Sequence, residues 1–158
     1  MPQAKSVSLF LLRIGLGWFM FYAGLIKIID PSWSAAGYLQ NAKTFAGFYH
    51  LLLDPALLPV VNIVNEWALF LIGVSLILGI AVRLSGILGA MLMMLYYFPV
   101  LDFPYIAPYS LLIDDHIIYA LALLVLAFHR AGRIWGLEKK CSQLPVCSRF
   151  PKLRFWLG

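Results

Sequence analysis

Three long apolar stretches restrict this chain to folds that cross a membrane. They are Val7–Ile26, Pro59–Val82 and Leu84–Leu101, and Arg13 and Glu66 are the only charged residues within them. A membrane-spanning helix needs about 20 mostly apolar residues. Hydrophobic residues make up 63% of the 158 residues and charged residues 12%, whereas a soluble domain is about half apolar and about a quarter charged. The sequence therefore predicts helices that are surrounded by lipid, the first of them retained and not cleaved as a signal peptide.

A fourth apolar segment is shorter. His116–Phe128 would form a helix of about 20 Å, which is too short to cross a bilayer. Extension back to Pro108 gives an adequate length and places Asp114 and Asp115 inside the helix. We predict this longer helix, and the alternative is a segment that enters the membrane without crossing it. The predicted fold is all-α: a polytopic membrane protein with a bundle of four transmembrane helices.

The distribution of positive residues predicts the orientation in the membrane. With four spans, most of the Lys and Arg residues fall on one side, and only Lys27 and Lys43 fall on the other. Because positive residues near helix ends mark the cytoplasmic side, we expect a protein of the cytoplasmic membrane with both termini in the cytoplasm. Residues 1–137 are predicted to form the membrane domain, and residues 138–158 a basic cytoplasmic tail on the lipid headgroups.

The tail carries the two cysteines of the chain, Cys141 and Cys147. A reducing compartment argues against a structural disulfide, and five intervening residues differ from the usual spacing of zinc ligands. Two unpaired thiols are the simpler interpretation, while a redox or metal role for the pair stays open. The chain has no recognisable nucleic-acid fold, so we expect no nucleic-acid partner.

The loop after the first predicted helix is rich in aromatic residues. Trp33, Tyr38, Phe45, Phe48 and Tyr49 lie within it, and aromatic rings settle at the level of the lipid headgroups. Ser34 is predicted to cap a short helix that runs through Leu39. We expect one or two short interfacial helices over the outer end of the bundle, either as simple anchors or as a functional lid.

Small residues recur along the predicted helices at the spacing that favours close helix packing. These residues are Gly17 and Gly24, Ser75 and Gly79, and Gly86 and Ala90. They predict a tight bundle and carry no chemistry.

Polar residues in the apolar stretches are the candidates for function, because charge at membrane depth is costly and tends to mark a site. Arg13 and Lys27 are 14 positions apart, nearly on one helix face. Asn62 and Glu66 are one turn apart on the second helix. At the start of the fourth helix one of Asp114, Asp115 and His116 is expected to face the bundle and one to cap the helix. Arg13 and Glu66 can equally form a structural ion pair.

A carboxylate and an imidazole that face an apolar cleft can transfer protons. A quinone requires such transfer, because its two-electron reduction takes up two protons. We predict Glu66, Asp115 and His116 as catalytic residues, and Tyr96 and Phe98 as further rings of an aromatic slot. The predicted quinone-binding residues are Arg13, Lys27, Asn62, Trp67 and Tyr97. Asp115, His116 and Glu66 are too few ligands for a convincing metal centre, so no metal is predicted.

Several segments in order resemble the DoxX/DoxD family of small four-helix membrane proteins, over roughly Leu11 to Leu137. They are Leu12–Gly17, Tyr22–Lys27, Trp33–Leu39, Phe45–Phe48, Glu66 with Leu71–Gly79, Arg83-Leu84, Asp115–Leu121 and Ala131–Leu137. The tail with its two cysteines lies beyond the resemblance.

The resemblance implies a four-helix bundle with both termini inside, and a role near quinone reduction coupled to oxidation of sulfur compounds, because DoxD members are the small subunit of thiosulfate:quinone oxidoreductase. We expect a membrane subunit that works with a second subunit or as a homo-oligomer. The alternatives are a non-catalytic scaffold that binds a lipid or a partner chain, and a proton-coupled transporter. The transporter is the weakest of these, because four spans without an internal repeat are unlike common transporters.

Overall fold

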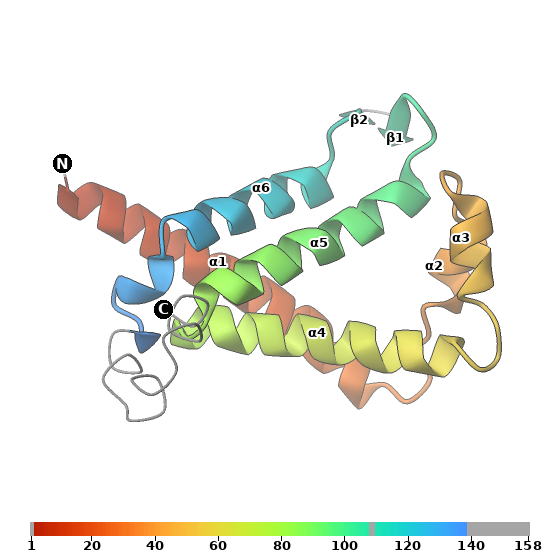
Figure 1. Cartoon of the computed structure of the whole chain (residues 1–158), viewed down its shortest axis with the longest axis horizontal. Coiled ribbons are helices and arrows are strands. Elements are labelled where there is room, and N and C mark those ends of the chain that lie inside the picture. Colours follow the sequence, from red (N-terminus) through yellow and green to blue (C-terminus); the bar gives the residue numbers. More distant parts are fainter. Residues whose placement is uncertain (1, 108–109, 139–158) are drawn as a thin grey trace.

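The computed structural model describes residues 2–107 and 110–138, and four longer helices dominate these residues (Figure 1). These helices are α1 (Pro2–Ile29), α4 (Leu58–Leu78), α5 (Val82–Val100) and α6 (Asp115–Phe128). The connections carry the short helices α2 (Ala36–Gln40) and α3 (Ala46–Leu51), the strands β1 (Tyr105–Ala107) and β2 (Ser110–Leu111), and the 3-10 turn η1 (Ala131–Arg133).

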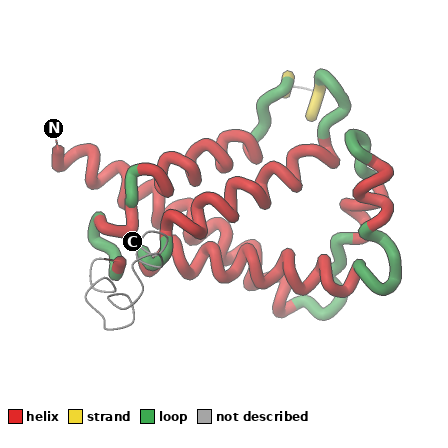
Figure 2. Tube along the Cα trace, viewed as in Figure 1, coloured by secondary structure: helices red, strands yellow, loops and turns green. Residues whose placement is uncertain are grey.

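The four longer helices pack as two pairs around one core. Helix α1 packs along α4, and α5 packs along α6. The shared core holds buried residues from all four helices, including Met20, Leu76, Met93 and Leu123. The start of α1, the α4–α5 turn and η1 lie at one end, which we call the terminal end, and α2 and α3 lie at the opposite end, which we call the lid end (Figures 1 and 2).

Glycines allow the paired helices to approach closely. A Cβ atom added at Gly24 of α1 would lie 2.4 Å from the backbone N of Phe70, and one added at Gly73 of α4 would lie 2.2 Å from the backbone N of Phe21. On α5, a Cβ atom at Gly86 would lie 2.7 Å from the carbonyl oxygen of Leu123. The close packing predicted from Gly24 and Gly86 is therefore confirmed.

The turn between α4 and α5 begins earlier than the sequence predicted. Gly79 has a φ of 68° and donates its N–H to the carbonyls of Ser75 and Leu76. This left-handed termination favours glycine, and it ends α4 at Leu78 instead of Val82. Val82 begins α5.

The prediction of a fourth helix from Pro108 through both aspartates is wrong. Ser110 and Leu111 form strand β2, which pairs antiparallel with β1. Asp114 is extended, with φ −125° and ψ −173°, and its side chain accepts the N–H of Ile117 at 3.2 Å. This N-cap begins the helix at Asp115, because the residue at the cap position has a non-helical backbone.

Short helices over one end of the bundle were expected and are present. Leu39 and Tyr49 are buried there in a second apolar cluster with residues of α4 and α5, such as Val61 and Phe98. The predicted cap of the first short helix is wrong in detail. Ala35 occupies the N-cap position without a side-chain bond. The Ser34 hydroxyl, one residue earlier, accepts the N–H of Ala36 at 3.2 Å.

We call residues 31–57, which include α2 and α3, the lid. Hydrogen bonds fasten it to both neighbouring helices. The Tyr49 hydroxyl donates to the carbonyl of Leu95 on α5 at 3.0 Å. On α4, the Asn62 side-chain oxygen accepts the N–H of Ala35 at 3.0 Å. The lid is therefore a fixed part of the fold.

Three helices of the described part are long and apolar enough to cross a membrane: Gln3–Ile29, Leu58–Leu78 and Val82–Val100. Helix α6 is apolar and has 14 residues. The fold is that of a membrane protein with several candidate spans.

Candidate functional site

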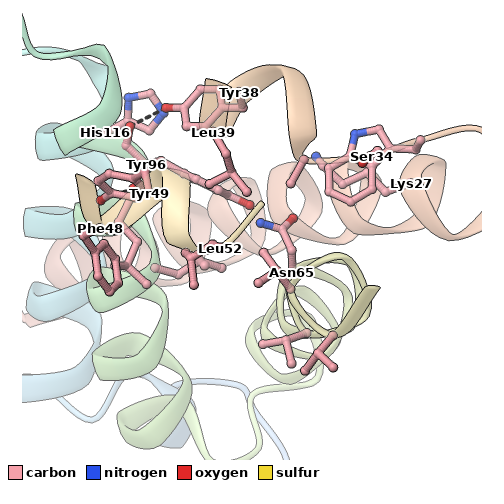
Figure 3. A pocket seen from close by; sticks show the side chains of 17 residues that line it. Lys27, Ser34, Tyr38, Leu39, Phe48, Tyr49, Leu52, Asn65, Tyr96 and His116 are labelled. Atoms are coloured by element: carbon pink, nitrogen blue, oxygen red, sulfur yellow. Dashed lines mark hydrogen bonds between the residues drawn. The ribbon is translucent and has the colours of Figure 1, made fainter. Parts of the chain in front are cut away.

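A cavity of about 570 Å³ lies beneath the lid. Its wall combines residues from the lid, α1, α4, α5 and the first turn of α6 (Figure 3). The aromatic wall residues are Trp33, Tyr38, Phe48, Tyr49 and Tyr96; the polar ones are Lys27, Ser34, Asn65 and His116; and the aliphatic ones are Ala35, Leu39, Leu52, Val60, Val61, Val64, Leu92 and Leu95. A volume of this size suits one small-molecule ligand.

Lys27 places a positive charge in the cavity wall. Its ammonium donates to the carbonyl of Ala23 at 3.2 Å and lies 5.3 Å from the centre of the Trp33 ring. Glu66 is its acidic neighbour. This arrangement follows from the position of Lys27 in the last turn of α1, where a cation interacts favourably with the helix dipole.

Two polar groups of the cavity wall have unused hydrogen-bonding capacity. Among the described residues, the buried Asn65 Oδ1 and Tyr96 hydroxyl have no hydrogen-bond partner within 3.5 Å. The Asn65 side chain nevertheless lies near enough to Tyr96 to interact with its hydroxyl. Buried polar groups usually find partners, so a small rearrangement or a ligand can satisfy this pair. The sequence reasoning missed Asn65, although it lies one helical turn from Asn62 in an apolar stretch.

His116 lies in the wall and is held by an aspartate. Its Nδ1 lies 2.6 Å from Asp114 Oδ2, and its ring meets the ring of Tyr96 edge-on at 5.9 Å between centres. Asp114 Oδ1 accepts the N–H of Ile117, so one carboxylate caps α6 and orients the imidazole. Asp115 Oδ1 is 3.7 Å from His116 Nδ1, and its side chain is 68% exposed. Asp114 is therefore the closer partner of His116, although Asp115 was the aspartate predicted as catalytic.

Partial desolvation changes the acidity of two lid tyrosines. Desolvation raises the pKa of Tyr38, and the neighbouring hydroxyls of Tyr96 and Tyr49 add to the shift, followed by Asp114 and Asp115. The Tyr38 hydroxyl donates to the carbonyl of Tyr96. Desolvation also raises the pKa of Tyr49. Both phenols stay neutral and act as hydrogen-bond donors.

The structure brings only part of the predicted site together. Lys27, His116 and Tyr96 line the cavity, whereas the other candidates do not. Asn62 supports the lid from behind, through its bonds to Ala35 N and Ser34 Oγ. Tyr97 is buried, and its hydroxyl donates to the carbonyl of Leu112 at 2.6 Å.

Three further candidates lie outside the wall. Glu66 lies near Lys27 and exerts its charge from there. Trp67 is 47% exposed on the outer face of α4, where its ring packs against Phe70. Asp115 is exposed beside the His116 ring.

The predicted interaction of Arg13 with Glu66 is wrong. Arg13 is fully buried at the terminal end, where its guanidinium packs against Gly79 and Gly136 and interacts electrostatically with Glu138. The physical reason is distance along α1, because 14 residues separate Arg13 from Lys27 by about 21 Å. This distance along the helix excludes Arg13 from the cavity.

Asp114, Asp115 and His116 offer possible metal-ligand atoms within 4.8 Å of one another. Both oxygens of Asp114 already have partners, in the helix cap and in the imidazole. The absence of a metal stays a prediction. Cys141 and Cys147 lie outside the described residues.

The fold and the cavity define a small helical membrane protein with a largely apolar ligand site. The DoxX family model matches residues 8–101, more than half of the chain, which therefore belongs to the DoxX family. The match includes the lid and ends before β1, so His116 lies beyond it. Comparisons with curated proteins and with solved structures give no match.

Proposed function

We propose that this DoxX protein is the membrane subunit of an oxidoreductase that passes electrons from a sulfur compound to quinone. The observation that carries the proposal is the aromatic cavity with Lys27 and His116 in its wall. An apolar slot accepts a quinone ring, and a few convergent polar groups fix the positions of its oxygens. Asn65 and Tyr96 add hydrogen-bonding groups in the same wall.

His116 is the proton donor of the proposed reaction. Asp114 binds Nδ1 and so leaves Nε2 as the nitrogen that faces away from the carboxylate. Quinone reduction takes up two electrons and two protons, and an imidazole at the ring edge can deliver these protons from the surface. Asp114 acts as the positioning residue.

The electrons come from a sulfur compound of the thiosulfate or thiol class. Two such molecules joined through a new sulfur–sulfur bond release two electrons, which balances the reduction of one quinone. A second subunit is expected to hold this donor site. The lid end is proposed to face outward and the terminal end the cytoplasm, in line with the positive residues at the terminal end.

A quinone-reductase assay in proteoliposomes tests the function. Thiosulfate, sulfite and thiols are offered in turn, alone and with membrane extract that supplies a partner subunit. We expect quinol formation with at least one donor, and at least a tenfold lower rate for His116→Gln. The matched control is His129→Gln, because His129 is exposed at the other end of α6. Equal rates in the two variants would remove His116 from the reaction.

Binding of quinone distinguishes this function from a non-catalytic scaffold. The proposed function requires quinone to co-purify with the detergent-solubilised protein and to be displaced by added quinone analogue. A tightly held partner chain without any quinone would instead favour the scaffold.

A further inference from the structure

Hydrogen bonds hold the lid against α5 at the cavity. The Tyr38 hydroxyl donates to the carbonyl of Tyr96, and the Tyr49 hydroxyl to that of Leu95. Lys43 N–H donates to the carbonyl of Pro99 at 3.0 Å, further along α5. These bonds join the lid to the last two turns of α5, in addition to its two bonds with Asn62 of α4. A ligand that entered through the lid would have to break several of them at once.

Part of the cavity wall is also exposed at the side of the helix bundle. Val60 and Val64 of α4 and Leu95 of α5 line it, yet they are 56%, 59% and 49% exposed. Helices α4 and α5 meet at the Gly79 turn and diverge toward the lid end (Figure 1). Both are candidate spans, so exposed apolar residues between them face lipid.

The opening lies at membrane depth. Val64 is six residues beyond Leu58 at the start of α4, about 9 Å along the helix axis. The two basic wall residues come from other helices, Lys27 from α1 and His116 from α6. The two basic residues of the wall therefore lie on other helices than Val64 and Leu95.

We propose that the cavity takes its ligand sideways from the bilayer, through a portal between Val64 of α4 and Leu95 of α5, and that the ligand is a quinone with a long isoprenoid tail. The identity of the ring rests on the proposed function, and the route rests on the geometry of the portal. The ring lies between Lys27 and His116. A cavity of about 570 Å³ holds the ring and the first part of the tail, and the remaining tail passes between α4 and α5 into lipid.

Photo-crosslinking of the wild-type protein in phospholipid nanodiscs tests the route. The probe is a quinone with a diazirine on the third isoprene unit of its tail. We expect the crosslinks on the segments of α4 and α5 that contain Val64 and Leu95, and their loss when unlabelled tailed quinone is added. Crosslinks on α2 and α3 would overturn the lateral route while leaving quinone binding intact.

Exchange kinetics of the bound quinone give a second test. Val64→Trp and Leu95→Trp narrow the portal, and we expect at least tenfold slower exchange of bound tailed quinone. The controls are Leu71→Trp and Leu88→Trp, each on the same helix face two turns deeper and 56% and 47% exposed. Equal exchange rates in portal and control variants would overturn the proposal.

The two tests separate the route from the function. If the wild-type protein binds no quinone in nanodiscs, the proposed function and the proposed identity of the ligand are both wrong. If quinone binds and reaches the cavity at the same rate in every variant, only the proposed lateral route is wrong.

Discussion

Arg13 is a buried charged residue whose hydrogen-bonding capacity is partly unused. It is fully buried, and its Nε and Nη1 atoms have no hydrogen-bond partner within 3.5 Å among the described residues. Glu138 is 1% exposed, and neither of its carboxylate oxygens has a hydrogen-bond partner within 3.5 Å among the described residues. The guanidinium also lies 5.4 Å from the centre of the Phe10 ring. Removal of one member of a buried pair of opposite charges is destabilising, because the other charge is left buried without compensation.

Arg13→Met is therefore expected to destabilise the protein by about 3 kcal/mol, because it leaves Glu138 buried without this positive neighbour. The double variant Arg13→Met with Glu138→Gln should regain most of the loss. Unfolding midpoints in detergent measure both effects. Additive losses in the double variant would show that the two residues do not interact.

Glu138 also predicts a pH dependence of stability. Burial raises the pKa of its carboxyl, against the smaller lowering effects of Arg133, Arg130 and Arg13. The folded protein then holds the proton to a higher pH than the unfolded chain, so this contribution to stability is present at low pH and is lost as pH rises through the folded pKa. We expect the unfolding midpoint of Glu138→Gln to lack a decline that the wild type shows as pH rises through the raised folded pKa of Glu138. Parallel curves would contradict this.

At the scale of elements, the α1–α4 pair depends on backbone contact. A Cβ atom at Gly24 would lie 2.4 Å from backbone N of Phe70, which cannot move without shifting the helix. Gly24→Ala should therefore destabilise the protein by about 2 kcal/mol, as overpacking does. Gly15→Ala on the same helix is the matched control, because nothing lies within 4 Å of its added Cβ. Thermal unfolding in detergent compares the two, and equal midpoints would show that α1 and α4 separate without cost.

The start of α6 depends on one carboxylate. Asp114→Ala removes the acceptor of the Ile117 N–H and should cost about 1 kcal/mol, whereas Asp114→Asn should retain most of the cap. Asp115→Ala is the control, because that side chain is exposed. Hydrogen exchange at the Ile117 amide reports the cap directly. Unchanged protection in Asp114→Ala would mean that α6 begins without it.

At the scale of the whole molecule, the positions of the helix ends determine which loops share a side of the membrane. The start of α1 and η1 lie at the terminal end, opposite the lid (Figure 1). In a background with Cys141→Ser and Cys147→Ser, a membrane-impermeant thiol reagent should label Asn41→Cys in intact cells and leave Lys5→Cys unlabelled. Both positions are exposed. The reverse labelling pattern would invert the proposed orientation.

Hydrophobicity made the helices predictable, because it is a property of each segment alone. Val7–Ile26 and Leu84–Leu101 lie within a few residues of α1 and α5. The lid helices were also predictable, since aromatic residues and turn signals are local. The fourth helix was misjudged because its apolar content was extended through Ser110 and Leu111, where backbone pairing with β1 prevails.

The candidate site was harder to predict, because it depends on where helices lie relative to one another. Lys27 and His116 reached the cavity from α1 and α6. Asn65 was overlooked in favour of its neighbour Glu66, and Asp115 was predicted as catalytic although Asp114 is the aspartate that binds His116. Adjacent residues on a helix point about 100° apart. A rotation of the helix about its axis by less than this angle therefore decides which of two neighbours faces the cavity.

The amino-acid sequence by itself determined that this protein lies in a membrane, that it does so through long apolar helices, and that a few ionisable groups accompany them. These outcomes follow from the transfer of each segment into lipid, which needs no knowledge of the other segments. Only the tertiary structure decided the partner of Arg13, the acid that orients His116, and the cavity between diverging α4 and α5. Each of these depends on the rotation and depth of packed helices, which arise from contacts between residues far apart in the chain.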